Sequence, residues 1–300
     1  MDALPIADAH QHFWNLETGE CPRWLKGEPM HAFRYGSIDK LRRSYLPADY
    51  RRDAARHNVV KTVYVEAEWP QADPLAEIRW LAGLREREGL PTVAVGQAWF
   101  ERPDIGEVLA GHALYGFVRG VRQKPVAAAR PGDCTPGAPG SMGHESFRRG
   151  YALLARYGFS YDLQTPWWHL PEAVDLARSF PDTLLILNHT GLPADRSSEA
   201  LTAWRQALQG LARQPNTRLK LSGIGSREQT WGYASNERVV LDAISIFGVH
   251  RCLFASNFPV DGICAGFDTI YSGFKRMVRN FTPTEQRALF HDNAVAVYRL

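Results

Sequence analysis

Short runs typical of β-strands alternate with helical patterns along almost all of the 300 residues. Runs rich in apolar and β-branched residues occur at eight places: 5–10, 60–68, 92–100, 116–122, 159–164, 183–189, 217–223 and 251–257. Between most of them, apolar residues recur three or four positions apart, as on one face of a helix. The clearest such stretches are 74–89, 145–158, 170–180, 198–214 and 236–248. This alternation predicts a parallel sheet covered by helices.

Two folds share this alternation: a closed (β/α)₈ barrel and an open doubly wound sheet. No glycine-rich nucleotide motif follows the first run, which argues against the open sheet. Polar residues recur instead at the ends of the runs, where the active sites of such barrels lie. These residues are His12, Glu68, Arg122, Gln164, His189 and Asn257. We therefore predict the α/β class, as a (β/α)₈ TIM barrel with a single domain over residues 1–300.

Two segments are too long for the minimal connections of a barrel. Residues 14–46 follow the first run and contain His31, and residues 123–144 are rich in Pro, Gly and Ala without periodicity. Long barrel loops are commonly lids or binding loops, or simply mobile segments. We expect both segments to be long loops at the carboxyl-terminal face of the barrel.

Charge and cysteine content exclude several classes of protein. The net charge is only +3 and the basic residues are scattered, so we expect no nucleic-acid partner. No apolar stretch approaches the ~18 residues of a membrane span, and the first residues lack a basic leader, so we expect no membrane partner. Four cysteines without CxxC spacing are typical of a reducing cytoplasm. The expected partner is a small-molecule substrate, and the sequence leaves a homo-oligomer open.

The first run ends in two histidines, His10 and His12. Alternate side chains of a strand share a face, so we expect Asp8, His10 and His12 on one side. A His-x-His pair at a strand end can bind one divalent ion, and imidazole suits zinc. Such pairs also occur on surfaces without any ligand. His189 ends the sixth run and is expected at the same mouth, which strengthens the interpretation as a site.

Three motifs together resemble the amidohydrolase superfamily: HQH at 10–12, NHTG at 188–191 and FASNFP at 254–259. The similarity is greatest to its branch of lactone hydrolases and predicted metal-dependent hydrolases. It extends to residues 44–54, 161–182, 220–225 and 290–300. The resemblance implies a (β/α)₈ barrel that hydrolyses a lactone or a similar small molecule. It also implies that His10, His12 and His189 are catalytic, and that in some members a zinc ion is bound.

One position departs from the family pattern. The eighth strand of the family normally ends in an aspartate that acts as general base and often touches the metal, whereas this chain has Asn257. A neutral amide does not accept a proton from water as a carboxylate does, and losing the charge weakens binding of a divalent ion. Members of the branch differ in whether they need a metal. The three histidines can therefore bind a divalent metal, zinc above others, or act without one by donating hydrogen bonds to the carbonyl and the developing oxyanion.

Another base is then needed, and Asp261 is the first candidate because it follows the same strand. A turn-forming aspartate before Gly262 is an equally good interpretation. Glu68 ranks next, although Glu66 and Glu68 could instead form ion pairs inside the barrel. His31 is the third candidate, from the long first loop.

Arg119 and Arg122 are candidates for binding substrate, because guanidinium groups bind carboxylates well. They lie three residues apart, so we expect only one of them to contact substrate, and pairing with Glu66 or Glu68 is the alternative. Trp167 could stack on a substrate ring or fill a gap between barrel and helices. Glu68 and His31 complete the set.

The sequence thus predicts an amidohydrolase-like hydrolase. Its substrate is expected to be a small carboxylate-bearing molecule, a lactone of a sugar acid or of an aromatic-breakdown dicarboxylate. The alternatives are a decarboxylase or hydratase on the same barrel, or a non-catalytic ligand-binding protein that has lost the aspartate at position 257.

Overall fold

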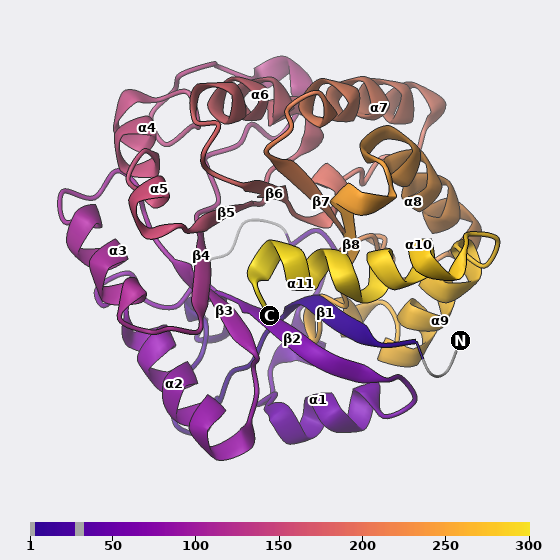
Figure 1. Ribbon diagram of the computed structural model, residues 1–300, viewed down its shortest axis with the longest axis horizontal. Helices are drawn as coiled ribbons and strands as arrows, with labels where there is room; N and C mark the ends of the chain where they lie inside the picture. The colour runs from indigo at the N-terminus through magenta and orange to yellow at the C-terminus, as the bar shows by residue number, and fades with distance from the viewer. Residues whose placement is uncertain (1–3, 28–32) are drawn as a thin grey trace.

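The computed structural model describes residues 4–27 and 33–300, which leaves the predicted site residue His31 outside the described residues. Eight parallel strands form one sheet in sequence order, surrounded by a ring of helices (Figure 1). The strands are β1 (Ile6–Gln11), β2 (Val59–Val65), β3 (Val93–Gln97), β4 (Val118–Arg122), β5 (Ser160–Leu163), β6 (Leu185–Leu187), β7 (Thr217–Leu221) and β8 (Cys252–Phe254). The predicted (β/α)₈ fold is confirmed.

The sheet closes where β1 meets the segment that follows β8. The backbone N–H of Asn257 donates to the carbonyl oxygen of His10 at 2.8 Å, and the N–H of His12 donates to the carbonyl of Phe258 at 2.8 Å. The residues that close the barrel are therefore the same ones that carry the histidine pair and the FASNFP motif.

Helices connect the strands and cover the outside of the barrel. They are α1 (Pro47–Ala54), α2 (Ala76–Glu88), α3 (Ile105–Ala113), α4 (Glu145–Tyr151), α5 (Leu154–Tyr157), α6 (Leu170–Ser179), α7 (Ser198–Ala212), α8 (Tyr233–Phe247), α9 (Phe267–Met277), α10 (Pro283–Arg287) and α11 (Asn293–Tyr298). All five helical predictions are confirmed, except that the stretch 145–158 is two helices, α4 and α5. None of the helices in the described residues is long and apolar enough to cross a membrane.

The amino-terminal end of the barrel is packed rather than open. Small and branched side chains such as Ala7, Val63 and Leu253 form one buried cluster inside the strands, together with Tyr298 of α11. Figure 1 shows α11 lying across this end of the barrel. The Tyr298 hydroxyl donates to Asp162 Oδ1 at 3.0 Å. Chemistry is therefore directed to the opposite, carboxyl-terminal end, as in other barrels of this kind.

An irregularity in β1 decides which of its polar side chains face inward. Asp8 pairs with Thr62 of β2 and Gln11 pairs with Tyr64, so three steps along β1 match two along β2. Such a β-bulge shifts the alternation of side chains by one residue. Asp8 consequently bonds Tyr50 of α1 at 2.7 Å outside the barrel, while His10 faces the interior near Lys220. The expectation that Asp8 shares a face with His10 and His12 is therefore wrong.

The two long segments follow β1 and β4 at the carboxyl-terminal end, as predicted. The described parts of 14–46 contain two short 3₁₀ turns, Arg23–Leu25 and Asp39–Leu41, and the 123–144 segment contains one, Pro131–Asp133. Neither has longer regular structure in its described residues. Both are long loops beside the mouth of the barrel.

Candidate active site

Three buried histidines meet at the carboxyl-terminal mouth of the barrel. His10 and His12 come from the end of β1, and His189 begins the turn after β6. The ring centroid of His10 lies 5.0 Å from that of His12 and 4.6 Å from that of His189. None of the three is more than 4% exposed. The structure therefore brings together the three histidines that the sequence singled out.

The loop after β7 fixes the position of His189. Gly223 has a φ of +64°, and a Cβ at this position would lie 2.5 Å from Cγ of His189. The Ser222 hydroxyl lies 3.0 Å from His189 Nδ1. The glycine of the KLSG sequence is therefore required for a close approach of the backbone to the imidazole.

Hydrogen bonds assign the tautomers of two histidines. Nδ1 of His12 lies 2.7 Å from the carbonyl oxygen of Val65, which can only accept, so Nδ1 carries the proton and Nε2 is an acceptor. Nδ1 of His10 lies 3.5 Å from the ammonium of Lys220, which can only donate, so the proton is on Nε2. This His10 Nε2–H is buried, and it has no hydrogen-bond partner among the described residues.

All three imidazoles are neutral near neutral pH. Burial, with Arg122 next in effect, lowers the pKa of His12 to about 3. Burial also holds the pKa of His10 and of His189 well below the usual value, with further effects from nearby cations. A neutral imidazole donates a hydrogen bond from one ring nitrogen and accepts one at the other without placing a charge in the site.

Two ion pairs lie beside the histidines. Lys220 and Asp162 form a salt bridge in which both side chains are fully buried. Arg122 pairs with Glu66, and its Nη1 donates to Gln164 Oε1 at 3.2 Å. Arg122 therefore lies at the mouth, but its charge is already paired, as the alternative interpretation expected.

The structure places Arg119 away from the histidines. Its guanidinium donates to the carbonyl of Gly116, just before β4, and burial together with the charges of Arg299 and Arg85 lowers its pKa. Arg119 and Arg122 are three residues apart, so they project to opposite sides of β4. The prediction that Arg119 contacts substrate is not supported by this position, whereas Arg122 remains a candidate.

Two further predicted residues lie at the rim. Glu68 has a left-handed φ of +62° and pairs with Lys124 at 2.7 Å. Trp167 is half-buried beside Gly191 in the turn that begins at His189. Its ring makes an edge-to-face contact with Trp168, at 5.5 Å between centroids. Roles for Glu68 and Trp167 in binding substrate stay predictions.

Asn257 and Asp261 form one hydrogen-bonded unit. Nδ2 of Asn257 donates to Asp261 Oδ1 at 2.6 Å, and the Tyr35 hydroxyl donates to the same oxygen at 2.8 Å. The backbone N–H of Gly223 donates to Oδ2 at 3.0 Å. A carboxylate offers about four acceptor positions, so one remains on Oδ2. Burial raises the pKa of Asp261 and so makes it a stronger base.

Several residues of the mouth were not identified from the sequence. Gln97 ends β3 and Asn188 follows β6, and both are fully buried. They lie two positions after Val95 and Ile186, whose side chains face the inside of the barrel, and so share that face. The side-chain amides of both lack hydrogen-bond partners among the residues the structure describes. Strand-end position is the signal that could have identified them. Arg34 and Tyr35, from the first long loop, carried no such signal.

The arrangement can be tested for its fit to a divalent metal. Within residues 4–27 and 33–300, no three His, Cys, Asp or Glu side chains are placed to hold one ion. Lys220 places the proton of His10 on Nε2, and a protonated nitrogen is not a ligand. Asn257 brings no charge. These residues fit hydrogen-bond donation better than ligation, so we derive no step through a metal.

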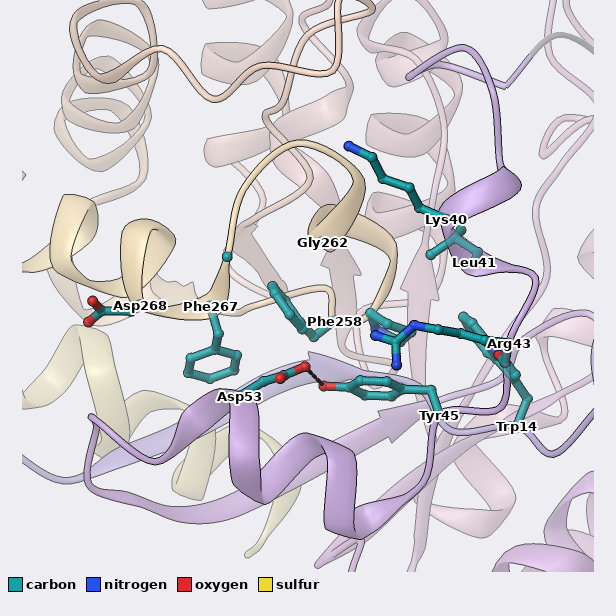
Figure 2. A pocket seen from close by; sticks show the side chains of 12 residues that line it. Trp14, Lys40, Leu41, Arg43, Tyr45, Asp53, Phe258, Gly262, Phe267 and Asp268 are labelled. Carbon is teal, nitrogen blue, oxygen red and sulfur yellow. Dashed lines mark hydrogen bonds between the residues drawn. The ribbon is translucent and has the colours of Figure 1, made fainter.

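A separate cavity of about 520 Å³ lies beside the mouth, between α1, α9 and the loops after β1 and β8 (Figure 2). Its walls include Trp14, Tyr45, Phe258 and Phe267, and the Tyr45 hydroxyl donates to Asp53 at 3.0 Å. The three histidines are not among its lining residues. The cavity is therefore distinct from the histidine site.

Comparisons with known proteins agree with this geometry. The chain matches the family model described as amidohydrolase over residues 7–300. It is 38% identical over 300 residues to the uncharacterized protein y4mH of Sinorhizobium fredii, with all of both chains covered. It is 28% identical over 315 residues to an L-fucono-1,5-lactonase of Burkholderia multivorans, covering 100% of this chain and 97% of the relative.

A solved structure shows the same fold. An amidohydrolase of Burkholderia multivorans with bound zinc matches with a TM-score of 0.80 and 24% identity, covering 98% of this chain and 99% of that one. The family model matches nearly the whole chain, from residue 7 to residue 300. The chain belongs to the amidohydrolase family and is a hydrolase of that family.

Proposed function

We propose that this hydrolase opens a lactone, a cyclic ester, by direct attack of water on the ester carbonyl. One observation carries the proposal: the Nε2–H of His10 is a fully buried donor, at the centre of the histidine cluster, with no partner among the residues that the structure describes. An unpartnered buried donor costs free energy unless a ligand accepts its hydrogen bond. A carbonyl oxygen that becomes an oxyanion is the acceptor such a donor stabilises.

Asp261 is the proposed proton acceptor. The carboxylates of Glu66 and Asp162 each have a cation in direct contact, whereas the nearest cation to Asp261 is 3.8 Å away. Burial raises the pKa of Asp261, and one of its acceptor positions is unused. Asn257 holds the carboxylate in place, which gives the amide at this position a positioning role.

The steps balance as an ester hydrolysis. Water attacks the carbonyl carbon while Asp261 takes a proton from the attacking water. The Nε2–H of His10 stabilises the oxyanion that forms. The ring C–O bond then breaks, the leaving alkoxide receives the proton from Asp261, and a hydroxy acid is released. The full-length similarity to an L-fucono-1,5-lactonase supports this reaction class.

Acid release from a panel of lactones tests the proposal. The panel contains the neutral L-fucono-1,5-lactone and the anionic 2-pyrone-4,6-dicarboxylate. We expect turnover of at least one lactone, and a loss of roughly 100-fold or more in kcat for His10→Ala. The exposed Arg87→Gln variant of α2 is the matched control. Turnover unchanged in His10→Ala would overturn the proposal.

Product analysis separates the other candidate functions. Release of carbon dioxide from an aromatic acid, or hydration without ring opening, would assign a decarboxylase or a hydratase in place of a lactonase. Ligand binding without turnover of any lactone would assign a binding protein. Zinc content measured on the same preparation shows whether turnover depends on a metal.

A further inference from the structure

Most charges at the mouth are already neutralised by direct ion pairs. Arg122 pairs with Glu66, Lys220 with Asp162 and Lys124 with Glu68. These cations have little capacity left to recognise an anionic group on a substrate. Two other arginines near the mouth, Arg34 and Arg196, are different.

Arg34 lies in the loop after β1 with several free donors. Its side chain is 21% exposed, but Nε and Nη2 are buried and make no hydrogen bond to the described residues. The guanidinium stacks on Tyr35, with Cζ 4.6 Å from the ring centroid. Among the residues that the structure describes, its nearest acid is Asp261, at 3.8 Å from Nη2, beyond hydrogen-bond distance. Asn257 and Tyr35 already donate to Oδ1, the oxygen nearest to Arg34, so the donors of Arg34 are left for another acceptor.

Arg196 lies in the loop after β6, and its hydrogen-bond partners in the described chain are neutral. Its Nη2 donates to the carbonyl oxygen of Ile224 at 3.2 Å and lies 3.5 Å from Asn236 Oδ1. Nη1 is buried without a partner in that part of the chain. Burial lowers the pKa of Arg196 to about 10, so the group is still charged at neutral pH. A buried guanidinium without a counter-charge is costly unless an anion binds it.

The two arginines lie on the His189 side of the mouth. Arg34 Nη2 lies 3.8 Å from Asp261, which accepts a hydrogen bond from the N–H of Gly223, the residue that packs on His189. Tyr35 links the pair, because its ring lies under Arg34 and its edge packs on Gly225, next to the Ile224 carbonyl to which Arg196 donates. The loops after β1 and β6 both leave the carboxyl-terminal ends of their strands, where substrate enters.

We propose that Arg34 and Arg196 form a carboxylate-binding subsite beside the histidine cluster. The inference rests on the proposed lactone hydrolysis and deepens it, since it requires a substrate with a carboxylate separate from the ester that is cleaved. A guanidinium binds a carboxylate through two parallel N–H groups, and the free donors here include Nε and Nη2 of one arginine. Anion recognition is thereby assigned to two loop residues whose charges are not already paired, as that of Arg122 is with Glu66.

A binding experiment tests the subsite without requiring turnover. The probe is tricarballylate, titrated calorimetrically into the purified full chain at constant ionic strength. We expect Arg34→Gln and Arg196→Gln each to weaken binding by roughly tenfold or more, because hydrogen bonds to charged groups are the strong ones. Arg196→Lys keeps the charge and loses the fork, so an intermediate affinity is expected. Arg87→Gln should bind as the unmodified protein does.

A second arm uses turnover to separate the two proposals. The substrates are 2-pyrone-4,6-dicarboxylate and its dimethyl ester, which differ in charge but share the lactone. We expect Arg196→Gln to raise KM for the diacid and to leave KM for the diester unchanged. Equal effects on both substrates, or unchanged tricarballylate affinity in the folded Gln variants, would overturn the subsite while lactone hydrolysis stands. Tricarballylate binding that depends on both arginines, with no lactone turned over, would support the subsite and overturn the proposed function.

Discussion

The ammonium of Lys220 lies 3.5 Å from Nδ1 of His10, and both side chains are completely buried. Lys220 is in turn bound to Asp162, whose other oxygen is 3.1 Å from the Tyr298 hydroxyl of α11. A chain of contacts therefore runs from the packed amino-terminal end of the barrel to the imidazole at its mouth. The tautomer of His10 is set by residues that do not reach the substrate.

Lys220→Met tests this relationship. Without the ammonium, the proton of His10 is no longer held on Nε2, so we expect kcat to fall by roughly 100-fold while KM changes little. Breaking a buried ion pair also leaves Asp162 uncompensated, and the free energy of unfolding should fall by about 3–5 kcal/mol. Lactone turnover and urea denaturation measure the two effects.

The double variant Lys220→Met, Asp162→Asn separates the effect of Lys220 on His10 from its effect on the stability of the fold. Removing both charges should restore much of the lost stability, since no unpaired buried charge remains. Activity should stay low, because the donor to His10 Nδ1 is still missing. Recovery of turnover together with stability would show that Lys220 acts only on the fold.

Asn257→Asp tests the position at which this chain departs from the family. A carboxylate here would face Asp261, since Asn257 Nδ2 is 2.6 Å from Asp261 Oδ1. Two acids this close do not both ionise, so one pKa rises and the metal-free protein loses stability. We expect zinc to bind the variant more tightly and to restore its melting temperature. Thermal melts with and without zinc check this, with Asn257→Ala as the control that adds no charge.

The alternation of strand-like and helix-like segments was sufficient to predict the barrel and the convergence of three histidines. Eight strands that alternate with helices close into one barrel, and the carboxyl ends of parallel strands lie on one face of it. His10, His12 and His189 therefore had to lie close together. The β-bulge in β1 was not predictable in this way. It arises from pairing with β2, and the local composition around Asp8 has no signal for the shift.

The periodicity of the sequence could not predict the loop residues of the site. Arg34, Tyr35 and Arg196 lie in segments without regular structure, and long-range contacts determine their positions. Tyr35 reaches Asp261, which is 226 residues further along the chain. Conversely, Arg119 has the right residue type on the right strand, but its position near the start of β4 places it at the wrong end of the barrel.

The pH dependence of stability follows from the buried imidazoles. The pKa of His12 is about 3 in the folded protein, against an ordinary value of 6.5. Between these values the unfolded chain binds the proton and the folded chain does not. Stability that is fully present above pH 6.5 is therefore lost as the pH falls, by about 1.4 kcal/mol per pH unit from this residue.

Urea denaturation at several pH values measures the slope, which should be shallower in His12→Gln. An equal slope would contradict the folded-state pKa.

Gly223→Ala tests the contact that fixes His189, and Gly89→Ala is its matched control. Both glycines have positive φ, +64° and +71°, so an added methyl group strains both backbones. At Gly89 nothing lies within 4 Å of the new Cβ, whereas at Gly223 it would lie 2.5 Å from Cγ of His189.

We expect Gly89→Ala to cost about 1 kcal/mol of unfolding free energy and to leave kcat unchanged. Gly223→Ala should cost more and lower kcat by roughly 100-fold, because a displacement of about 1 Å is enough to disrupt catalysis. Equal stability losses with equal kcat in the two variants would show that the loop after β7 does not hold His189 in place.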